Sequence, residues 1–164
     1  MKEKVNTSKI ALRLRDKIFL AVCAFGLFFI LVSKVQQWIN PQPEPVLNAM
    51  EITIRQASYV VELPVTPKQM TKGLSNRESL EKKKGMMFVH NYPGIYSYTM
   101  KDMKFNLDFL FVKDKKIVDI AENVPFDFQG VIVGALEYDK VIELPGGSVN
   151  EEELQIGDEI FIPE

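Results

Sequence analysis

The sequence predicts a mainly β domain, a barrel or sandwich of about eight short strands with two or three short helices, preceded by one N-terminal transmembrane helix. Three observations predict this fold class. Apolar and polar residues alternate with a period of two over most of the chain after residue 85, which is the pattern of half-buried strands. Gly, Pro, Asn and Asp interrupt these runs at short intervals, as turns require. An uninterrupted apolar run over residues 18–32 lies near the N-terminus, as in a membrane span.

Basic charge is concentrated at the N-terminus. Residues 1–17 hold six basic and two acidic residues, a net charge of +4, whereas the whole chain has a formal net charge of −2. The rest of the chain therefore carries −6 and lacks the basic patch of nucleic-acid-binding proteins. We expect no nucleic-acid partner.

The apolar run predicts a signal anchor. Lys34 can extend its charged head to the membrane surface, and Trp38 suits the headgroup layer. Counted over residues 14–35, the segment is long enough for a span of about 20 residues. Because the basic residues precede it, the positive-inside rule places the N-terminus in the cytoplasm. The expected location is the cell membrane, single-pass, with the C-terminal domain outside the cytoplasm.

The apolar run has three alternatives to an anchor. A cleaved signal peptide needs small residues at its cleavage site, and FILVSKVQQWIN, residues 29–40, offers a weak one. A buried core helix is the second alternative. A lipoprotein signal at Cys23 is disfavoured because Val22 is bulky and the apolar run continues beyond the cysteine. The anchor is preferred over all three.

The domain organisation follows from these segments. NPQPEPVLN, residues 40–48, has three prolines alternating with polar residues and predicts an extended stalk. The predicted segments are a cytoplasmic basic tail over residues 1–17, an anchor over 18–35, a Pro-rich stalk over 36–49 and an exported β-rich domain over 50–164.

The exported domain opens with a predicted hairpin and a helix. EITIRQ, residues 51–56, and SYVVELPV, residues 58–65, alternate as two strands. Thr66, with Pro67 and Gln69 after it, forms a capping box that begins a helix, which Gly73 ends. Residues 75–78 form a second box, which predicts a further helical turn.

Strands dominate the remainder. The predicted strands lie at residues 85–90, 95–100, 104–112, 117–123, 131–136, 140–145 and 159–162. Between the last two, Ser148 and Glu151 predict a third helix start, and Gly157 a stop.

Asp108 occupies an unusual position within TMKDMKFNLDFLFV, residues 99–112. A period of two places Phe105, Leu107, Phe109 and Phe111 on one face, and the opposite face changes from polar to apolar at Asp108. A carboxylate at such a border needs a partner or a cavity. Arg77, Lys101 and Lys104 are candidate partners. Two interpretations stay open: Asp108 fixes a loop, through backbone amides or an arginine, or it faces a ligand.

GLSNRESL, GMMFVH, YTMKDMKFNLDFLFV, VIELPGG and IGD occur in this order over about 100 residues of the chain. Together they resemble the family called domain of unknown function 192. The resemblance places on the family pattern Gly73, Arg77, Leu80, Gly85, Met86, Phe88, Met100, Lys101, Leu107, Asp108, Glu143, Leu144, Gly147, Gly157 and Asp158. It implies a small β-rich barrel, often exported or membrane-anchored, with no settled activity. The chain departs from the pattern at Thr99, where the family usually has an aromatic residue, and at Asn106, where proline is common.

Several chemistries are excluded by composition. Cys23, the single cysteine, lies in the apolar run, so the exported domain has no disulfide, thiol nucleophile or cysteine metal site. His90 is the single histidine, which excludes a histidine-based triad or multi-histidine metal site. We expect no cofactor and no metal.

The expected function is binding, of a small polar or anionic ligand or of an envelope protein partner, in addition to the membrane. The candidate ligand-binding residues are Arg77, Lys101, Asp108 and Met100. One alternative is an envelope hydrolase with Asp108 as general base and Lys101 or Arg77 as electrostatic stabilisers. Another is a structural component of a membrane complex, which requires an exposed apolar patch. The enzyme is the less favoured hypothesis.

Overall fold

The structure, a computed structural model, describes residues 14–39 and 47–163, with side chains described from residue 19 to 35 and from residue 47 onwards. The chain divides into two compact units, Met1–Pro45 and Val46–Glu164. The predicted tail over residues 1–13 and the stalk over residues 40–46 lie outside the described residues.

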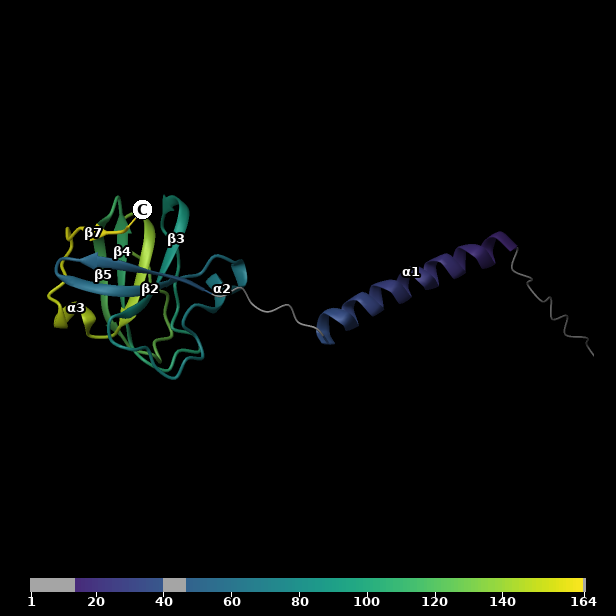
Figure 1. Cartoon of the computed structure of the whole chain (residues 1–164), viewed down its shortest axis with the longest axis horizontal. Coiled ribbons are helices and arrows are strands. Elements are labelled where there is room, and N and C mark those ends of the chain that lie inside the picture. Colours follow the sequence, from purple (N-terminus) through teal and green to yellow (C-terminus); the bar gives the residue numbers. More distant parts are fainter. Residues whose placement is uncertain (1–13, 40–46, 164) are drawn as a thin grey trace, which may run out of the picture. The chain divides into compact units, whose positions relative to one another are not determined.

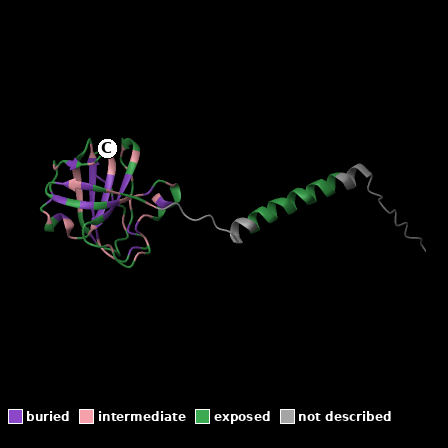
Figure 2. Cartoon of the chain, viewed as in Figure 1, coloured by how far each residue is buried: buried purple, intermediate pink, exposed green. Residues whose placement is uncertain are grey.

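The first unit contains one helix, α1 (Leu14–Ile39), which includes the predicted anchor segment 18–35 (Figure 1). Its large apolar side chains from Phe19 to Val35 are exposed (Figure 2). Over the part of the chain that is described, no helix combines the length and the apolar character needed to cross a membrane.

The second unit is a half-barrel built on one seven-stranded sheet. Its elements are β1 (Asn48–Ile54), β2 (Ala57–Leu63), α2 (Pro67–Lys72), β3 (Lys84–Gly94), β4 (Leu107–Lys113), β5 (Lys116–Val124), β6 (Tyr138–Pro145), α3 (Ser148–Glu151) and β7 (Ile160–Phe161). The strand order is β5-β4-β6-β3-β2-β1-β7, and Figure 1 shows the strongly curved sheet. β2 and β3 are parallel, whereas the other neighbours are antiparallel.

The two edge strands of the sheet meet at one end. Lys116 at the start of β5 forms an antiparallel bridge with Glu159, just before β7. The amide of Ile117 donates to the carbonyl of Asp158 over 3.0 Å, and the amide of Gly157 donates to the carbonyl of Ile117 over 2.8 Å. These bonds satisfy edge groups that would otherwise be open to pairing with another chain.

The sequence predicted two strands that the sheet does not contain. Residues 95–100 and 131–136 alternate as strands do, but they meet at a single bridge between Tyr98 and Ile132. Both segments instead cover one face of the sheet. The apolar residues in these segments alternate because every second side chain packs against the sheet. Neither segment is a strand, because no neighbouring strand forms a ladder of hydrogen bonds with it.

The helix predictions had mixed outcomes. α2 begins as predicted, because Thr66 and Gln69 form a complete capping box with Pro67 at the first turn. The helical turn predicted over residues 78–84, after the box at residues 75–78, is absent, since residues 75–83 fold as turns and irregular backbone and β3 begins at Lys84. α3 exists, but its N-cap is Gly147, and Ser148 donates to the carbonyl of Pro145 instead of capping the helix.

Both faces of the sheet carry an apolar core. The interior core contains residues from every strand and from α3: Ile52, Ile54, Ala57, Tyr59, Val61, Met87, Leu110, Val112, Ile117, Ile142, Leu144, Val149, Leu154 and Ile160. The outer core lies on the other face: Leu74, Met86, Phe88, Met100, Met103, Leu107, Phe109, Phe111, Val124, Ile132, Tyr138 and Val141. Figure 2 shows the buried residues along the strands.

β4 illustrates how the sequence produces two cores. Leu107, Phe109 and Phe111 belong to the outer core, whereas Leu110 and Val112 belong to the interior core. The predicted alternation of this strand is therefore confirmed. A strand buried on both faces is apolar at almost every position, which makes its single acid conspicuous.

Candidate functional site

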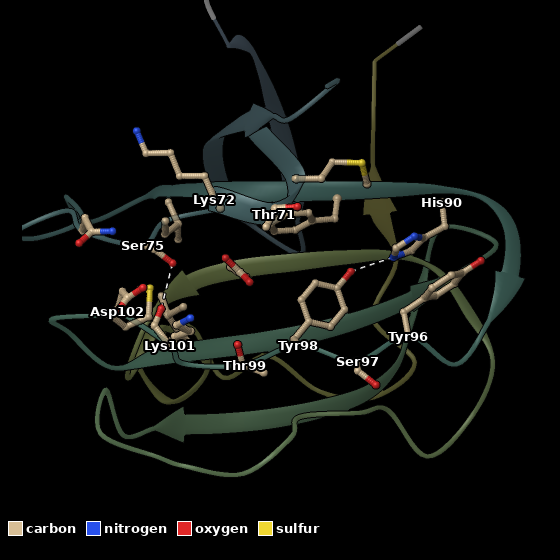
Figure 3. Close-up of a pocket in the computed structure, with 18 residues that line it drawn as sticks. Thr71, Lys72, Ser75, His90, Tyr96, Ser97, Tyr98, Thr99, Lys101 and Asp102 are labelled. Carbon is tan, nitrogen blue, oxygen red and sulfur yellow. Dashed lines mark hydrogen bonds between the residues drawn. The ribbon is translucent and has the colours of Figure 1, made fainter. Parts of the chain in front are cut away.

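A cavity of about 570 Å³ opens on the outer face of the half-barrel. The C-terminal end of α2 and the turn after it form one wall, and residues 96–103 form another (Figure 3). Side chains of β3, β4 and β6 supply the base. This size is within the range of small-molecule sites.

Glu143 is the one acid that β6 contributes to this cavity. It lies between Ile142 and Leu144, which face the interior core, so its own side chain faces the opposite way. Across the sheet it is level with Met86 on β3 and Phe109 on β4, both members of the outer core. The side chain therefore projects from an apolar surface into the base of the cavity.

The side chain of Glu143 is largely buried, and its carboxyl faces the cavity without a protein partner. The residue is 6% exposed, and no hydrogen bond or ion pair joins its side chain to another described residue. Burial raises the pKa of Glu143 from its ordinary 4.5 to about 8, while the positive charge of Arg77 acts in the opposite direction. Removal from water disfavours the charged form, so the carboxyl is mostly neutral at pH 7.

Arg77 lies beside the cavity and is already paired. Its guanidinium donates two parallel hydrogen bonds to Glu62, Nη1 to Oε1 over 2.7 Å and Nη2 to Oε2 over 2.6 Å. These bonds lower the pKa of the Glu62 carboxyl. Glu62 is level with Met86 and thus with Glu143 across three adjacent strands. The pair is positioned to influence Glu143 electrostatically without bonding to it.

An aromatic wall closes one side of the cavity. His90 on β3 shares a 2.8 Å hydrogen bond between Nε2 and the hydroxyl of Tyr98 (Figure 3). The imidazole stacks on the Tyr96 ring, with 3.6 Å between centroids and 6° between planes. Burial lowers the pKa of His90 and raises that of Tyr98. Both groups are therefore neutral hydrogen-bonding partners at pH 7.

Two lysines lie at the mouth of the cavity. Lys72 ends α2, and Lys101 lies in the segment before β4; both are exposed. Neither forms an ion pair with a residue that the structure describes. The carbonyl of Lys101 accepts a 3.0 Å hydrogen bond from the Ser75 hydroxyl, which ties the two walls together (Figure 3). Asp102, also exposed, is the adjacent acid.

Asp108 lies elsewhere. It is fully buried, and its Oδ1 accepts from the amide of Asn123 over 2.5 Å while Oδ2 accepts from the amide of Val149 over 2.7 Å. It does not line the cavity, and the structure does not bring it together with Arg77 or Lys101. Because both oxygens are occupied by backbone amides, the geometry does not fit the hydrolase hypothesis, in which Asp108 acts as general base.

The other candidate residues divide between the site and the core. Lys101 lines the cavity, and Arg77 lies beside it. Met100 is 2% exposed within the outer core and does not line the cavity, unlike its neighbour Met103. In the described part of the chain, no group of three or more His, Cys, Asp or Glu residues could hold a metal ion.

Sequence reasoning missed Glu143 as a candidate site residue. The signal was present, because VIEL holds one acid among apolar residues of a strand, as the Asp108 segment does. The two acids differ in their positions in the sheet. The carboxylate of Asp108 accepts hydrogen bonds from backbone amides, whereas the carboxyl of Glu143 faces the cavity.

An apolar surface lies on the segment between β5 and β6. Its exposed side chains are Phe126, Phe128, Val131, Val133 and Leu136. Such side chains are what the structural-component hypothesis requires. Nothing in the contacts of the described residues indicates what covers them, so the cavity is the stronger candidate site.

Comparison with known proteins gives a family but no activity. A family model described as DUF192, Uncharacterized ACR, matches residues 50–162. A search of curated proteins finds no match.

Two solved structures are similar to this chain. A protein from Sinorhizobium meliloti 1021, described as a "putative transcription regulator", is 26% identical, with a TM-score of 0.69 over 73% of this chain and 97% of that one. A protein of unknown function from Novosphingobium aromaticivorans DSM 12444 is 28% identical, with a TM-score of 0.65 over 75% and 93%.

Proposed function

Since the chain belongs to the DUF192 family, described as Uncharacterized ACR, we propose a function from the site itself: the half-barrel is a binding module for a small polar ligand. The ligand occupies the cavity on the outer face of the sheet. The proposal extends to the chain as a whole: α1 anchors the protein in a membrane and holds the domain outside the cytoplasm.

One observation carries the binding proposal, namely an unpartnered carboxyl at the base of a cavity. Burying a polar group without a hydrogen bond is costly, and Glu143 is 94% removed from solvent, being 6% exposed. A structural acid would be bonded as Asp108 is. A group that remains unpaired beside a space of ligand size has the character of a binding group.

The expected result of a ligand screen is a thermal shift that depends on the cavity. We expect at least one small polar compound to raise the unfolding temperature of the full chain in detergent, because a ligand at 100 times its Kd stabilises by about 2.7 kcal/mol. Lys101→Gln, at the mouth of the cavity, should reduce the shift. Lys115→Gln serves as a matched control, since Lys115 is an exposed lysine away from this cavity. A panel without any shift, or equal losses in both variants, contradicts the proposal.

The anchor proposal rests on the sequence over residues 14–35 and goes beyond the described residues, among which no helix has the length and apolar character to cross a membrane. The 26-residue helix contains the unbroken apolar run 18–32, and its large apolar side chains from Phe19 to Val35 are exposed. Apolar side chains on every side of a helix suit the hydrocarbon core of a bilayer. The basic residues before the run favour an N-terminus in the cytoplasm.

Fractionation tests the anchor. We expect the full chain to remain in the membrane pellet after alkaline carbonate washing, and added protease to remove the domain from cells with a permeabilised outer layer while sparing an N-terminal tag. Leu27→Lys combined with Ile30→Lys should release the chain, because a charge at mid-span costs about 3 kcal/mol. Recovery of the parent in the soluble fraction would refute the anchor.

A further inference from the structure

We infer that the ligand is a small organic anion whose carboxylate or similarly charged oxygen accepts a hydrogen bond from the carboxyl of Glu143 at the base of the cavity. This inference rests on the proposed binding function and specifies the ligand class. It starts from the geometry of one buried group and from the charges around it.

The carboxyl of Glu143 has a hydrogen-bond donor that no described residue uses. A protonated carboxyl has one O–H donor and retains acceptor sites. No described residue accepts from that donor, and the side chain is buried against Met86 and Phe109 in the outer core. A ligand oxygen is the missing acceptor, and a charged oxygen is the best one, because hydrogen bonds to ionised groups are about twice as strong as neutral ones.

The charged groups around Glu143 favour an anionic ligand. The titratable groups that face Glu143 or line its cavity are Lys72 at the end of α2, Arg77 with its partner Glu62, His90 on β3, and Tyr96, Tyr98, Lys101 and Asp102 in the segment before β4. Arg77 and Glu62 compensate each other, and His90 and Tyr98 are neutral. The two lysines against one aspartate leave a net positive mouth while Glu143 is neutral. An anion entering this space is attracted by the lysines and meets no opposing charge at the base.

A cationic ligand is the opposite case. An ammonium group would need Glu143 to ionise, which the apolar base of the cavity disfavours. It would also share a small space with Lys72 and Lys101, next to Arg77. Binding of a positive ligand is therefore opposed by the cost of ionising Glu143 and by repulsion from the lysines, whereas an anion meets neither of these two obstacles.

A pH dependence follows. The pKa of Glu143 is raised to about 8, so below that pH the donor is present without any proton uptake. Above it, anion binding must first return a proton to Glu143, and the affinity should fall about tenfold per pH unit. The pKa of His90 is lowered and that of Tyr98 is raised, so neither group changes its charge just above pH 8.

Methionine methyl groups give a site-specific readout. The full chain in detergent, labelled with methyl-¹³C methionine, reports on the cavity through Met70 and Met103, which line it. Met87 belongs to the interior core and serves as an internal control. The probes are benzoate and lactate, their neutral amides benzamide and lactamide, and the cation benzylamine.

The expected result is that the acids shift Met70 and Met103 but not Met87, and bind at least tenfold more tightly than their amides at pH 6.5. Between pH 8 and pH 9.5 the affinity of the parent for the acids should fall about 16-fold, because the protonated fraction of a group with a pKa of about 8 falls from about one half to about 3%. In Glu143→Gln, which keeps a neutral donor at every pH, the affinity should stay constant over the same interval.

The other outcomes separate the two proposals. Amides or benzylamine that bind as well as the acids would overturn the anion inference and leave the binding function standing. If no probe moves Met70 or Met103, both are contradicted. A parallel loss of affinity in the parent and in Glu143→Gln above pH 8 would assign the pH dependence to another group and overturn the role of Glu143.

Discussion

Asp108→Ala is expected to lower the free energy of unfolding by about 4 kcal/mol. The substitution removes two hydrogen bonds to a charged acceptor, each worth about 1.5–3 kcal/mol, and leaves buried amides without a partner. Those amides belong to Asn123, at the end of β5, and Val149, in α3. The carboxylate of Asp108 therefore holds the end of β5 and the α3 helix against β4. Urea unfolding followed by far-UV circular dichroism measures the loss.

Two controls test the cause of that loss. Asp127→Ala changes an exposed aspartate and should alter stability by no more than about 0.5 kcal/mol. Asp108→Asn keeps one acceptor but turns an NH₂ group toward an amide, so it should remain clearly less stable than the parent. An Asp108→Ala variant within 1 kcal/mol of the parent would show that the two bonds contribute little.

Glu143 should make the domain less stable as the pH rises from 4.5 to 8. Its pKa is raised from 4.5 to about 8 in the folded state, so the folded protein holds a proton that the unfolded chain releases. Such a group contributes its stability below pH 4.5 and loses it as the pH rises through 8. At 1.36 kcal/mol per pH unit, the loss over this window is roughly 4 kcal/mol.

The difference between the parent and Glu143→Gln isolates this contribution. The two proteins should differ least near pH 4.5 and diverge up to pH 8, with the glutamine variant the more stable, because it carries no charge to bury. Glu122→Gln removes an exposed carboxyl and should follow the parent. Unfolding curves of the parent and Glu143→Gln that stay parallel across the window would mean that the carboxyl is not neutral in the folded state.

The sequence correctly predicted features that depend on residues close to one another in the chain, such as strand alternation and helix capping. The period of β4 assigned Leu107 and Leu110 to opposite faces, and the capping residues located the start of α2. The resemblance to the family is confirmed by the family match, and the mainly β fold class by the half-barrel. Membrane anchoring and the nature of the ligand stay predictions.

The sequence could not predict features that depend on distant contacts. Asp108 is bonded to amides 15 and 41 residues away, and because every residue except proline offers such an amide, no pattern identifies them. Lysines and Arg77 were the visible alternatives for Asp108, but Arg77 pairs with Glu62. For Glu143, the decisive fact is the cavity between residues 96–103 and α2, which only the packing of those segments creates.

The meeting of the two sheet edges determines when the domain can fold. β7 pairs with β1 through Thr53 and Phe161, and the neighbouring bridge joins Lys116 to Glu159. Contacts of such high sequence separation form slowly, because loop closure must precede them. During synthesis this edge of β1 has no partner until β7 has left the ribosome. Completion of the sheet therefore follows the synthesis of all six other strands.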